Sequence, residues 1–134
     1  MNHMSAVADT LVPLIVAFQQ MHDCIQICYL FGSHAKGNAT AESDIDIAVL
    51  LQDGADPVVD LLLADYLAEK LGKKIDIVVL NRASSILQHE VVRDGIRLLE
   101  ASPMVRRLFE LRSFRGYVDA VFFQRKRNMR LSHG

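Results

Sequence analysis

Apolar residues recur at helical spacing at the start of the chain and then gather into short continuous runs. Over residues 5–22 they stand three or four positions apart, which predicts an amphipathic helix with Ser5 as a candidate N-cap. Pro13 would delay or kink that helix. Residues 25–31 form a short, partly β-branched run that ends at a glycine and predicts a buried strand. The small polar residues of 33–43 predict a turn with room for one turn of helix.

Three further apolar runs predict the rest of a sheet. Residues 44–51 and 75–80 are nearly continuous apolar segments interrupted by aspartates, and residues 96–99 would suit a short edge strand. Strands this apolar need helices to cover them, because their side chains avoid water. We therefore expect a protein of the α/β (α+β) class, with a small mixed β-sheet of three to four strands packed by helices.

Two helices are predicted between these strands from their end signals. The first is capped by Asp56, has Pro57 as its first residue and ends at Gly72. The second begins at Ser84 or Ser85. The predicted order is then helix, strand, strand, helix, strand, helix, short strand and a final helix.

That final helix is predicted to be long, from about residue 103 to residue 127. Pro103 suits its first turn, and apolar residues fall near one stripe made of Met104, Leu108, Leu111, Val118 and Val121 or Phe122. More aromatic surface is present than one core stripe needs, contributed by Phe109, Phe114, Tyr117 and Phe123. We expect at least two of these rings in the core, and the others would be free to contact a partner.

Length and composition indicate one domain over residues 1–134, with a core of its own. Apolar residues make up 51% of the chain and charged residues 23%, which argues against disorder. No apolar stretch is long enough to span a membrane, and the N-terminal residues lack the basic and apolar regions of a signal peptide. We therefore expect a cytoplasmic protein.

The two cysteines, Cys24 and Cys28, stand four positions apart. A zinc site would need two more ligands at suitable spacing, and the five histidines are scattered along the chain. We expect both cysteines to pack as small buried apolar residues in a reducing compartment, with no zinc and no disulfide.

Charge is unevenly distributed along the chain. Residues 1–102 carry 7 basic and 14 acidic side chains, a net charge of −7, whereas residues 103–134 carry 8 basic and 2 acidic ones, a net charge of +6. A basic helix on an acidic body would suit an acidic protein surface or a nucleic acid as partner, with a solvated helix face as the alternative. No RNA-binding module surrounds the basic residues 125–127, so direct nucleic-acid binding is not expected.

Candidate chemistry lies where the first strand ends and the second begins. Gly32 and Ser33 follow the first strand, and Asp44 and Asp46 come after ten further residues. A glycine–serine turn lets backbone N–H groups and a hydroxyl approach phosphate oxygens, and Lys36 could neutralise a terminal phosphate. Aspartates at i and i+2 of a strand leave the same face, and a divalent cation would relieve their repulsion. The alternative is that Asp44 caps a turn and that Asp46 is a strand residue exposed to solvent.

Asp76 is the only charge in the third predicted strand. An unpaired carboxylate buried in such a run would be costly. If this strand lies beside the second one, Asp76 reaches the face that carries Asp44 and Asp46. Three carboxylates could then bind one or two Mg²⁺ ions and accept a proton from a nucleophile. The alternative is an aspartate that faces solvent or pairs with Lys73 or Lys74.

The pattern Gly-Ser, ten residues, Asp-x-Asp resembles the signature of the nucleotidyltransferase superfamily that includes DNA polymerase beta, with Asp76 at the place of the third carboxylate. The short chain is similar to the minimal nucleotidyltransferases, or MNT proteins, over roughly residues 6–125. The resemblance implies ATP as the substrate and one or two Mg²⁺ ions as cofactor. It implies that the metal is held by Asp44, Asp46 and Asp76 and the phosphates by Gly32 and Ser33.

MNT proteins are commonly antitoxins, and their partner is a HEPN-domain ribonuclease toxin. The resemblance therefore implies an antitoxin that transfers AMP from ATP to a tyrosine hydroxyl of a HEPN toxin and inactivates it. Polymerases carry a second, substrate-binding domain for which this chain has no room, so a partner protein is expected to supply the acceptor. The alternative is a binding-only antitoxin that covers the toxin without catalysis.

Overall fold

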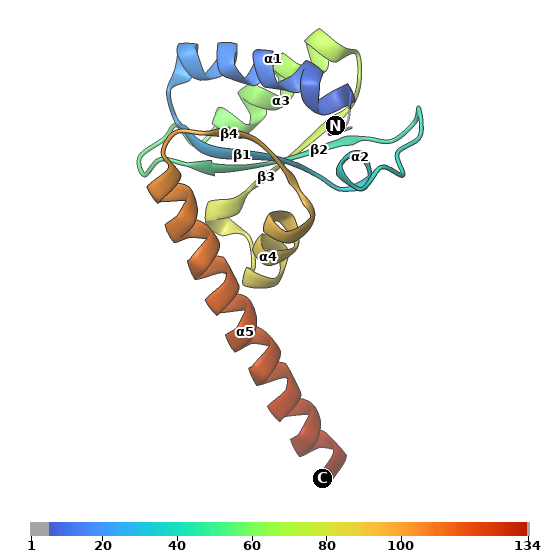
Figure 1. The fold of residues 1–134 in the computed structure, drawn as a ribbon, viewed down its shortest axis with the longest axis vertical. Helices are drawn as coiled ribbons and strands as arrows, with labels where there is room; N and C mark the ends of the chain where they lie inside the picture. Colours follow the sequence, from blue (N-terminus) through green and yellow to red (C-terminus); the bar gives the residue numbers. More distant parts are fainter. Residues whose placement is uncertain (1–5, 134) are drawn as a thin grey trace.

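A four-stranded mixed sheet forms the centre of the computed structural model, which describes residues 6–133 (Figure 1). The strands lie in the order β3-β2-β1-β4 and span Ile75–Val79, Ile45–Leu51, Ile25–Phe31 and Ile96–Glu100, respectively. Strand β1 pairs antiparallel with β2 and β4, and β2 pairs parallel with β3. The predicted mixed sheet is confirmed, and each predicted strand is found with its ends shifted by at most one residue.

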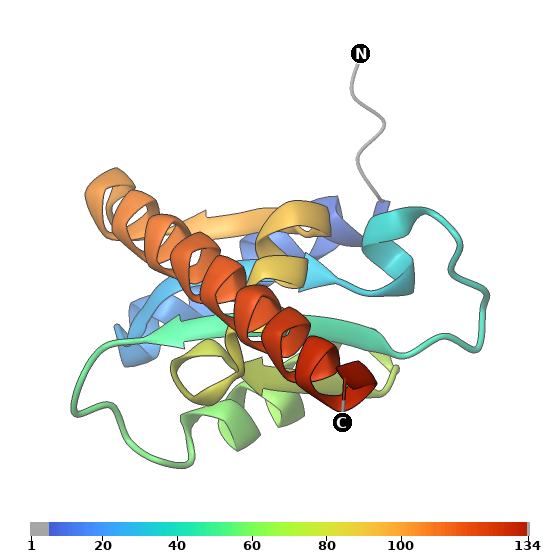
Figure 2. The ribbon, with the colours of Figure 1, turned by 90° about the horizontal axis from the view of Figure 1, so that it is seen from below.

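Helices cover both faces of the sheet. One face is covered by α1 and α3 and the other by α4 and α5 (Figure 1), and α5 crosses its face obliquely with α4 beside it (Figure 2). The bounds are α1 Ala6–His22, α2 Ser33–Lys36, α3 Val59–Leu71, the 3-10 turn η1 Leu80–Arg82, α4 Ser85–Asp94 and α5 Pro103–His133. Cover on both sides explains why the strands are apolar on both faces. Within residues 6–133, no helix is both long and apolar enough to cross a membrane.

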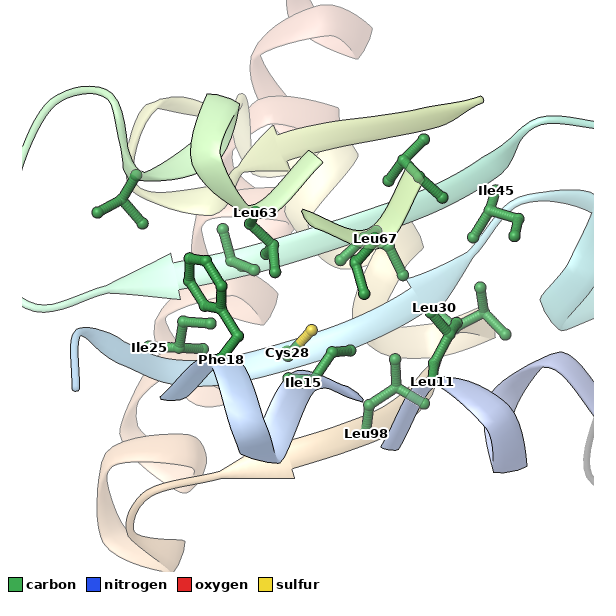
Figure 3. Packing of buried hydrophobic residues seen from close by; sticks show 14 of the residues in the cluster. Leu11, Ile15, Phe18, Ile25, Cys28, Leu30, Ile45, Leu63, Leu67 and Leu98 are labelled. Carbon is green, nitrogen blue, oxygen red and sulfur yellow. The ribbon is translucent and has the colours of Figure 1, made fainter. Parts of the chain in front are cut away.

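The larger core lies between the sheet and helices α1 and α3 (Figure 3). Side-chain alternation along β2 directs Ile45, Ile47 and Val49 into this core, where all three are fully buried. The helices contribute residues spaced three or four positions apart, so that one side of each faces the sheet: Leu11, Ile15 and Phe18 from α1, and Leu63 and Leu67 from α3.

Cys24 and Cys28 are buried, unpaired thiols in this core, as predicted. Burial raises the pKa of both thiols, because a buried thiolate would lose its hydration. Both side chains therefore stay neutral and pack as small apolar groups.

Helix α1 is continuous through Pro13, whose side chain is exposed. The helix already begins at Ala6, so the predicted delay of its start is wrong. The exposed proline ring leaves the packing of the opposite side of the helix undisturbed. The candidate N-cap, Ser5, lies outside the described residues.

Helix α3 begins at Val59, two residues later than predicted. The Val58 N–H donates to Oδ1 of Asp56 (3.1 Å), and the Val59 N–H donates to the Asp56 carbonyl oxygen (3.0 Å). Asp56 and Pro57 thus form a turn that leads into the helix. The predicted C-terminal end is confirmed, since Gly72 takes a left-handed conformation there.

Helix α5 is held against the sheet by one aromatic ring and a polar network. Phe109 is 9% exposed and packs with the smaller core cluster, which includes Tyr29. The Tyr29 hydroxyl donates a 2.7 Å hydrogen bond to Glu110, and Arg106 forms ion pairs with Glu110 (3.1 Å) and Glu100 (2.7 Å). Burial and the hydrogen bond to Glu110 raise the pKa of Tyr29, so the phenol stays a donor.

The apolar stripe from which α5 is predicted does not face the body of the protein. Phe109 and Ser113 face the body, whereas the predicted stripe is exposed at Met104, Leu108, Leu111, Val118 and Phe122. Of the four aromatic residues, Phe109 is buried and Tyr117 is partly buried, while Phe114 and Phe123 are exposed. The helix runs to His133, beyond the predicted end near residue 127.

We predict that Phe109→Ala lowers the free energy of unfolding by about 3 kcal/mol, because it removes a buried ring and leaves a cavity under α5. The matched control is Phe123→Ala on the same helix, where the ring is 71% exposed and the expected change is within about 0.5 kcal/mol. Urea denaturation followed by circular dichroism measures both. Equal losses in the two variants would contradict the observed orientation of α5.

Candidate active site

Three aspartates gather at one end of the sheet. Asp46 is the second residue of β2 and Asp76 the second residue of β3, and the two are register partners across the parallel pair. Asp44 immediately precedes β2. Because side chains alternate along a strand, Asp46 lies on the side that carries Ala48, which packs with the cluster under α4 and α5. The structure therefore brings the predicted carboxylates to the α4/α5 face of the sheet.

Gly32 lies directly against the Asp46 side chain. Phe31, the last residue of β1, pairs with Asp46, so the chain leaves the strand beside this carboxylate. A Cβ on Gly32 would collide with Oδ2 of Asp46 and would lie 3.1 Å from its Cγ. Gly32 also has φ 73° and ψ −153°, a conformation nearly restricted to glycine. Two independent constraints thus require glycine at this position.

The turn after Gly32 forms the single helical turn α2. The Gly32 carbonyl oxygen accepts the N–H groups of Ala35 and Lys36, both at 3.1 Å. The Ser33 hydroxyl has no hydrogen-bond partner in the part of the chain that the structure describes. It is therefore available to a ligand next to Asp46, as the phosphate-turn prediction requires.

Lys36 is exposed and lies near the C-terminal end of α4. The pKa of Asp94 is lowered mainly by its hydrogen bond from Arg93, and the charge of Lys36 lowers it further. The distances from Arg93 to the Asp94 oxygens are 3.0 and 2.8 Å. Lys36 thus shares its surroundings with an aspartate that sequence reasoning did not connect with this loop, because α4 is distant in the chain.

Charge repulsion is built into the site. The pKa of Asp46 is raised, first by burial and then by the negative charges of Asp76 and Asp44. The charge of His34 acts in the opposite direction, and its Nε2 lies 3.4 Å from the Ser43 carbonyl oxygen. Sequence reasoning missed this role of His34. A cation bound among the carboxylates would relieve the same repulsion.

Two lysines contact the segment that leads into β2. Nζ of Lys74 is 3.7 Å from Oδ2 of Asp44, and Nζ of Lys73 donates to the Ala41 carbonyl oxygen at 3.2 Å. Neither lysine forms an ion pair with Asp76 within residues 6–133. The alternative in which Asp76 pairs with one of them is therefore wrong. The contact between Lys74 and Asp44 follows from the parallel register of β2 and β3.

The carboxylates form an all-oxygen donor set of the kind that Mg²⁺ prefers. Their side chains do not converge in the orientation described: among residues 6–133, no three His, Cys, Asp or Glu side chains are placed to share a metal ion. The Asp44 side chain is 42% exposed, and within residues 6–133 it is held only by a surface ion pair, which is weak enough to be exchanged for a divalent cation. The donor chemistry of the three carboxylates fits Mg²⁺.

A cavity of about 340 Å³ lies away from the carboxylates, under α5 at the opposite end of β2. Its lining includes Leu51, Asp53, Leu108 and Arg112. Because Asp46 is at the start of β2 and Leu51 is at its end, this cavity belongs to a different part of the surface.

Comparison with known families places the site within a family domain. Residues 14–104 match the family described as "Polymerase beta, Nucleotidyltransferase". This segment covers more than half of the chain and includes Gly32, Ser33 and all three aspartates.

Individual relatives agree with that match. The chain is 43% identical over 74 residues to a protein adenylyltransferase MntA of Shewanella oneidensis, covering 55% of this chain and 53% of the relative. It spans slightly more than half the length of the curated relatives it matches first. A chain of a crystal structure of a toxin–antitoxin with AMP-PNP superposes with a TM-score of 0.75 at 30% identity, covering 92% of this chain and 98% of that one.

A second solved structure is similar over the same extent. It holds a tri-AMPylated Shewanella oneidensis HEPN toxin in complex with an MNT antitoxin, and one of its chains superposes with a TM-score of 0.70 at 27% identity. The match covers 95% of this chain and 99% of that chain.

We predict that Gly32→Ala lowers the free energy of unfolding by about 3 kcal/mol, from backbone strain and the collision with Asp46. Gly37→Ala is the matched control: Gly37 also has positive φ, at 79°, but a Cβ there meets no atom within 4 Å, so about 1 kcal/mol is expected. In an Asp46→Ala background the cost of Gly32→Ala should shrink, which a double-mutant cycle by urea denaturation measures. An unchanged cost would show that Asp46 does not press on Gly32.

We predict that Asp46→Asn raises the thermal unfolding midpoint at neutral pH. A carboxyl with a raised pKa in the folded state stabilises the fold only while protonated, and this stability is lost as the pH rises through the raised pKa. Asparagine cannot ionise, so its advantage should be present at neutral pH and vanish below the ordinary pKa of aspartate. Added Mg²⁺ should raise the midpoint of the parent protein and leave that of Asp46→Asn nearly unchanged. Calorimetry at several pH values, with and without Mg²⁺, gives both readings.

Proposed function

The chain belongs to the polymerase beta nucleotidyltransferase family, and on that premise we propose that it transfers AMP from ATP to a tyrosine hydroxyl of a HEPN-domain ribonuclease toxin. The transfer would inactivate the toxin and make this chain an antitoxin. Support comes from a relative named protein adenylyltransferase and from similar structures that hold AMP-PNP or a tri-AMPylated HEPN toxin with its MNT antitoxin. Such a protein would act in the cytoplasm, where toxin and ATP are present.

One observation carries the proposal: Asp46 and Asp76 are register partners on parallel strands, and Gly32 lies against Asp46. The carboxylates and the turn that begins at Gly32 thereby lie within one small region of the surface. Partly buried carboxylates that repel each other are costly to a fold and are typical of sites that bind a cation or transfer a proton.

Asp44, Asp46 and Asp76 are the residues that would hold one or two Mg²⁺ ions. When bound, Mg²⁺ would neutralise charge on the triphosphate and on the phosphorus centre during transfer. Asp46 would contribute most to the binding free energy, because its repulsion with both neighbours is relieved at the same time.

The turn at Gly32 would bind the β- and γ-phosphates of ATP. Gly32 allows the backbone to approach the phosphates closely, and the Ser33 hydroxyl and backbone N–H groups would donate to their oxygens. Lys36 is on the same turn and would add a positive charge at the terminal phosphate, for which it would move away from Asp94.

Asp76 would position the acceptor hydroxyl and take its proton. The hydroxyl oxygen forms a bond to the α-phosphorus while the bond from that phosphorus to the bridging oxygen breaks, and pyrophosphate leaves with the electron pair. Atoms and charge balance as a phosphodiester on the acceptor, pyrophosphate and one proton held by the carboxylate.

The tyrosines of this chain are engaged elsewhere, which favours an acceptor on a partner. Tyr29 is buried and bound to Glu110, and Tyr66 packs near Phe18 on the opposite face of the sheet. Tyr117 stacks on the ring of His89 with centroids 4.0 Å apart.

The proposal is tested by incubating this chain with its HEPN partner, ATP and Mg²⁺ and weighing the partner by intact-protein mass spectrometry. We expect the partner to gain the mass of one or more AMP groups. Asp44→Asn and Asp46→Asn should each slow this gain by more than about 1000-fold, because the charges that hold the metal and triphosphate are lost. Asp9→Asn, a solvent-exposed aspartate in the first turn of α1, is the matched control and should leave the rate unchanged.

The same variants separate catalysis from a binding-only antitoxin. A binding-only antitoxin would leave the partner's mass unchanged and would inhibit RNA cleavage equally well with Asp46→Asn. The proposal instead requires that inhibition by substoichiometric amounts of this chain depends on ATP and on Asp46.

A further inference from the structure

We infer that the outward stripe of α5 is the docking surface for a protein partner that presents an apolar face flanked by acidic side chains. We define the outward stripe as Met104, Leu108, Leu111, Val118 and Phe122. The identification of this partner with the AMP acceptor rests on the proposed function, whereas the docking surface itself rests on the geometry of α5.

The outward stripe is a second apolar face on a helix whose other face is already packed over its N-terminal half. Phe109 and Ser113 are buried against the body, and every member of the outward stripe is between 46% and 69% exposed. Spacings of three, four and seven residues place its members on one side over about five turns of helix. Scattered exposed apolar residues are ordinary on a surface, but five of them aligned on one side of a helix mark a contact with another molecule.

Charge indicates what kind of molecule covers the outward stripe. Of the eight basic side chains in residues 103–134, only Arg106 forms an ion pair within the described residues. Arg115 and Lys126 interrupt or border the stripe, and Arg112 and Arg107 flank it. Nζ of Lys126 lies over the Phe122 ring, 4.9 Å from its centroid. None of these four cations is neutralised by a carboxylate within the described residues, so they are complementary to an acidic surface and would repel a second copy of the same helix. An acidic protein face therefore fits better than self-association.

A cavity adds an anchor point beside the outward stripe. Its volume is about 340 Å³, and Leu108 of the stripe and Arg112 of its flank both line it. An apolar side chain of the partner could enter it, while Arg112 would pair with an adjacent carboxylate. Side chains inserted into such pockets at the centre of an interface typically carry much of the binding free energy.

The position of α5 relative to the aspartates explains why docking there would serve the transfer. Asp46 lies on the α4/α5 face of the sheet, and α5 extends well beyond the sheet on that same side (Figure 1). A partner bound along the outward stripe would thus lie on the side of the sheet where its hydroxyl must approach. Docking would raise the local concentration of acceptor without contact to ATP.

The test is a titration of this full chain with the HEPN partner in the absence of ATP, followed by calorimetry, for the parent and the variant Val118→Glu/Phe122→Glu. We expect the Kd to rise at least tenfold in the variant, because two apolar contacts of the outward stripe are replaced by charges facing acidic side chains. Met21→Glu/Leu61→Glu is the matched control, with exposures of 62% and 63% on α1 and α3, and its Kd should equal the parent value. Equal thermal midpoints for the three proteins confirm that folding is unaffected.

The salt dependence of the Kd and the kinetics of AMP transfer test the same proposal. The parent Kd should rise with salt, and less so in Arg115→Ala, since a flanking cation has been removed. With ATP and Mg²⁺, Val118→Glu/Phe122→Glu should raise the KM for the partner and leave kcat at saturating partner unchanged. If no AMP is transferred even by the parent, the proposed function fails while the ATP-free titration still decides the docking surface.

Three results would overturn the proposal. The first is a partner Kd that is equal in Val118→Glu/Phe122→Glu and the parent. The second is a parent dimer in sedimentation that these substitutions break without changing the partner Kd. The third is that the parent binds phosphatidylserine vesicles or single-stranded RNA, and that Val118→Glu/Phe122→Glu abolishes this binding while the partner Kd stays unchanged.

Discussion

The contact between the Gly32 backbone and the Asp46 carboxylate is the constraint on which the site depends. It arises because β1 and β2 are antiparallel neighbours and Phe31 pairs with Asp46, so the chain must leave β1 beside that side chain. Only a residue without Cβ and with access to φ 73° and ψ −153° can make this exit. The turn that follows is thereby fixed next to the carboxylates, and two motifs separated by ten residues become one site.

The parallel pairing of β2 and β3 adds the third carboxylate. A parallel pair needs a crossover, which α3 supplies, and the register then places Asp76 beside Asp46. Holding these charges together disfavours the fold, as the raised pKa of Asp46 indicates. The fully buried residues of β2 on the opposite side, such as Ile47, offset that cost. A strand with one face in the core and the other carrying charge is stable and also retains a strained site.

Helix α5 has a comparable division of roles. Its inner side is fixed by Phe109 and by the hydrogen bond from Tyr29 to Glu110, which belong to the core. Its outer side keeps apolar and basic residues that the domain does not use. The rigid packing of the inner side gives the outer side a defined position relative to the carboxylates, and a partner would need such a fixed reference to present a hydroxyl for transfer.

The sequence by itself determined the strands, most helix ends, the mixed sheet and the pattern of Gly32, Ser33, Asp44 and Asp46, because periodicity and turn residues act over short distances. Tertiary structure alone decided which side of α5 packs, since both sides carry apolar residues at helical spacing and contacts with Tyr29, the sheet and α4 select between them. It also decided that Asp76 lies beside Asp46, that Lys74 pairs with Asp44 and that Lys36 lies near Asp94. These contacts join residues far apart in the chain, and strand order and register, which no local pattern encodes, bring them together.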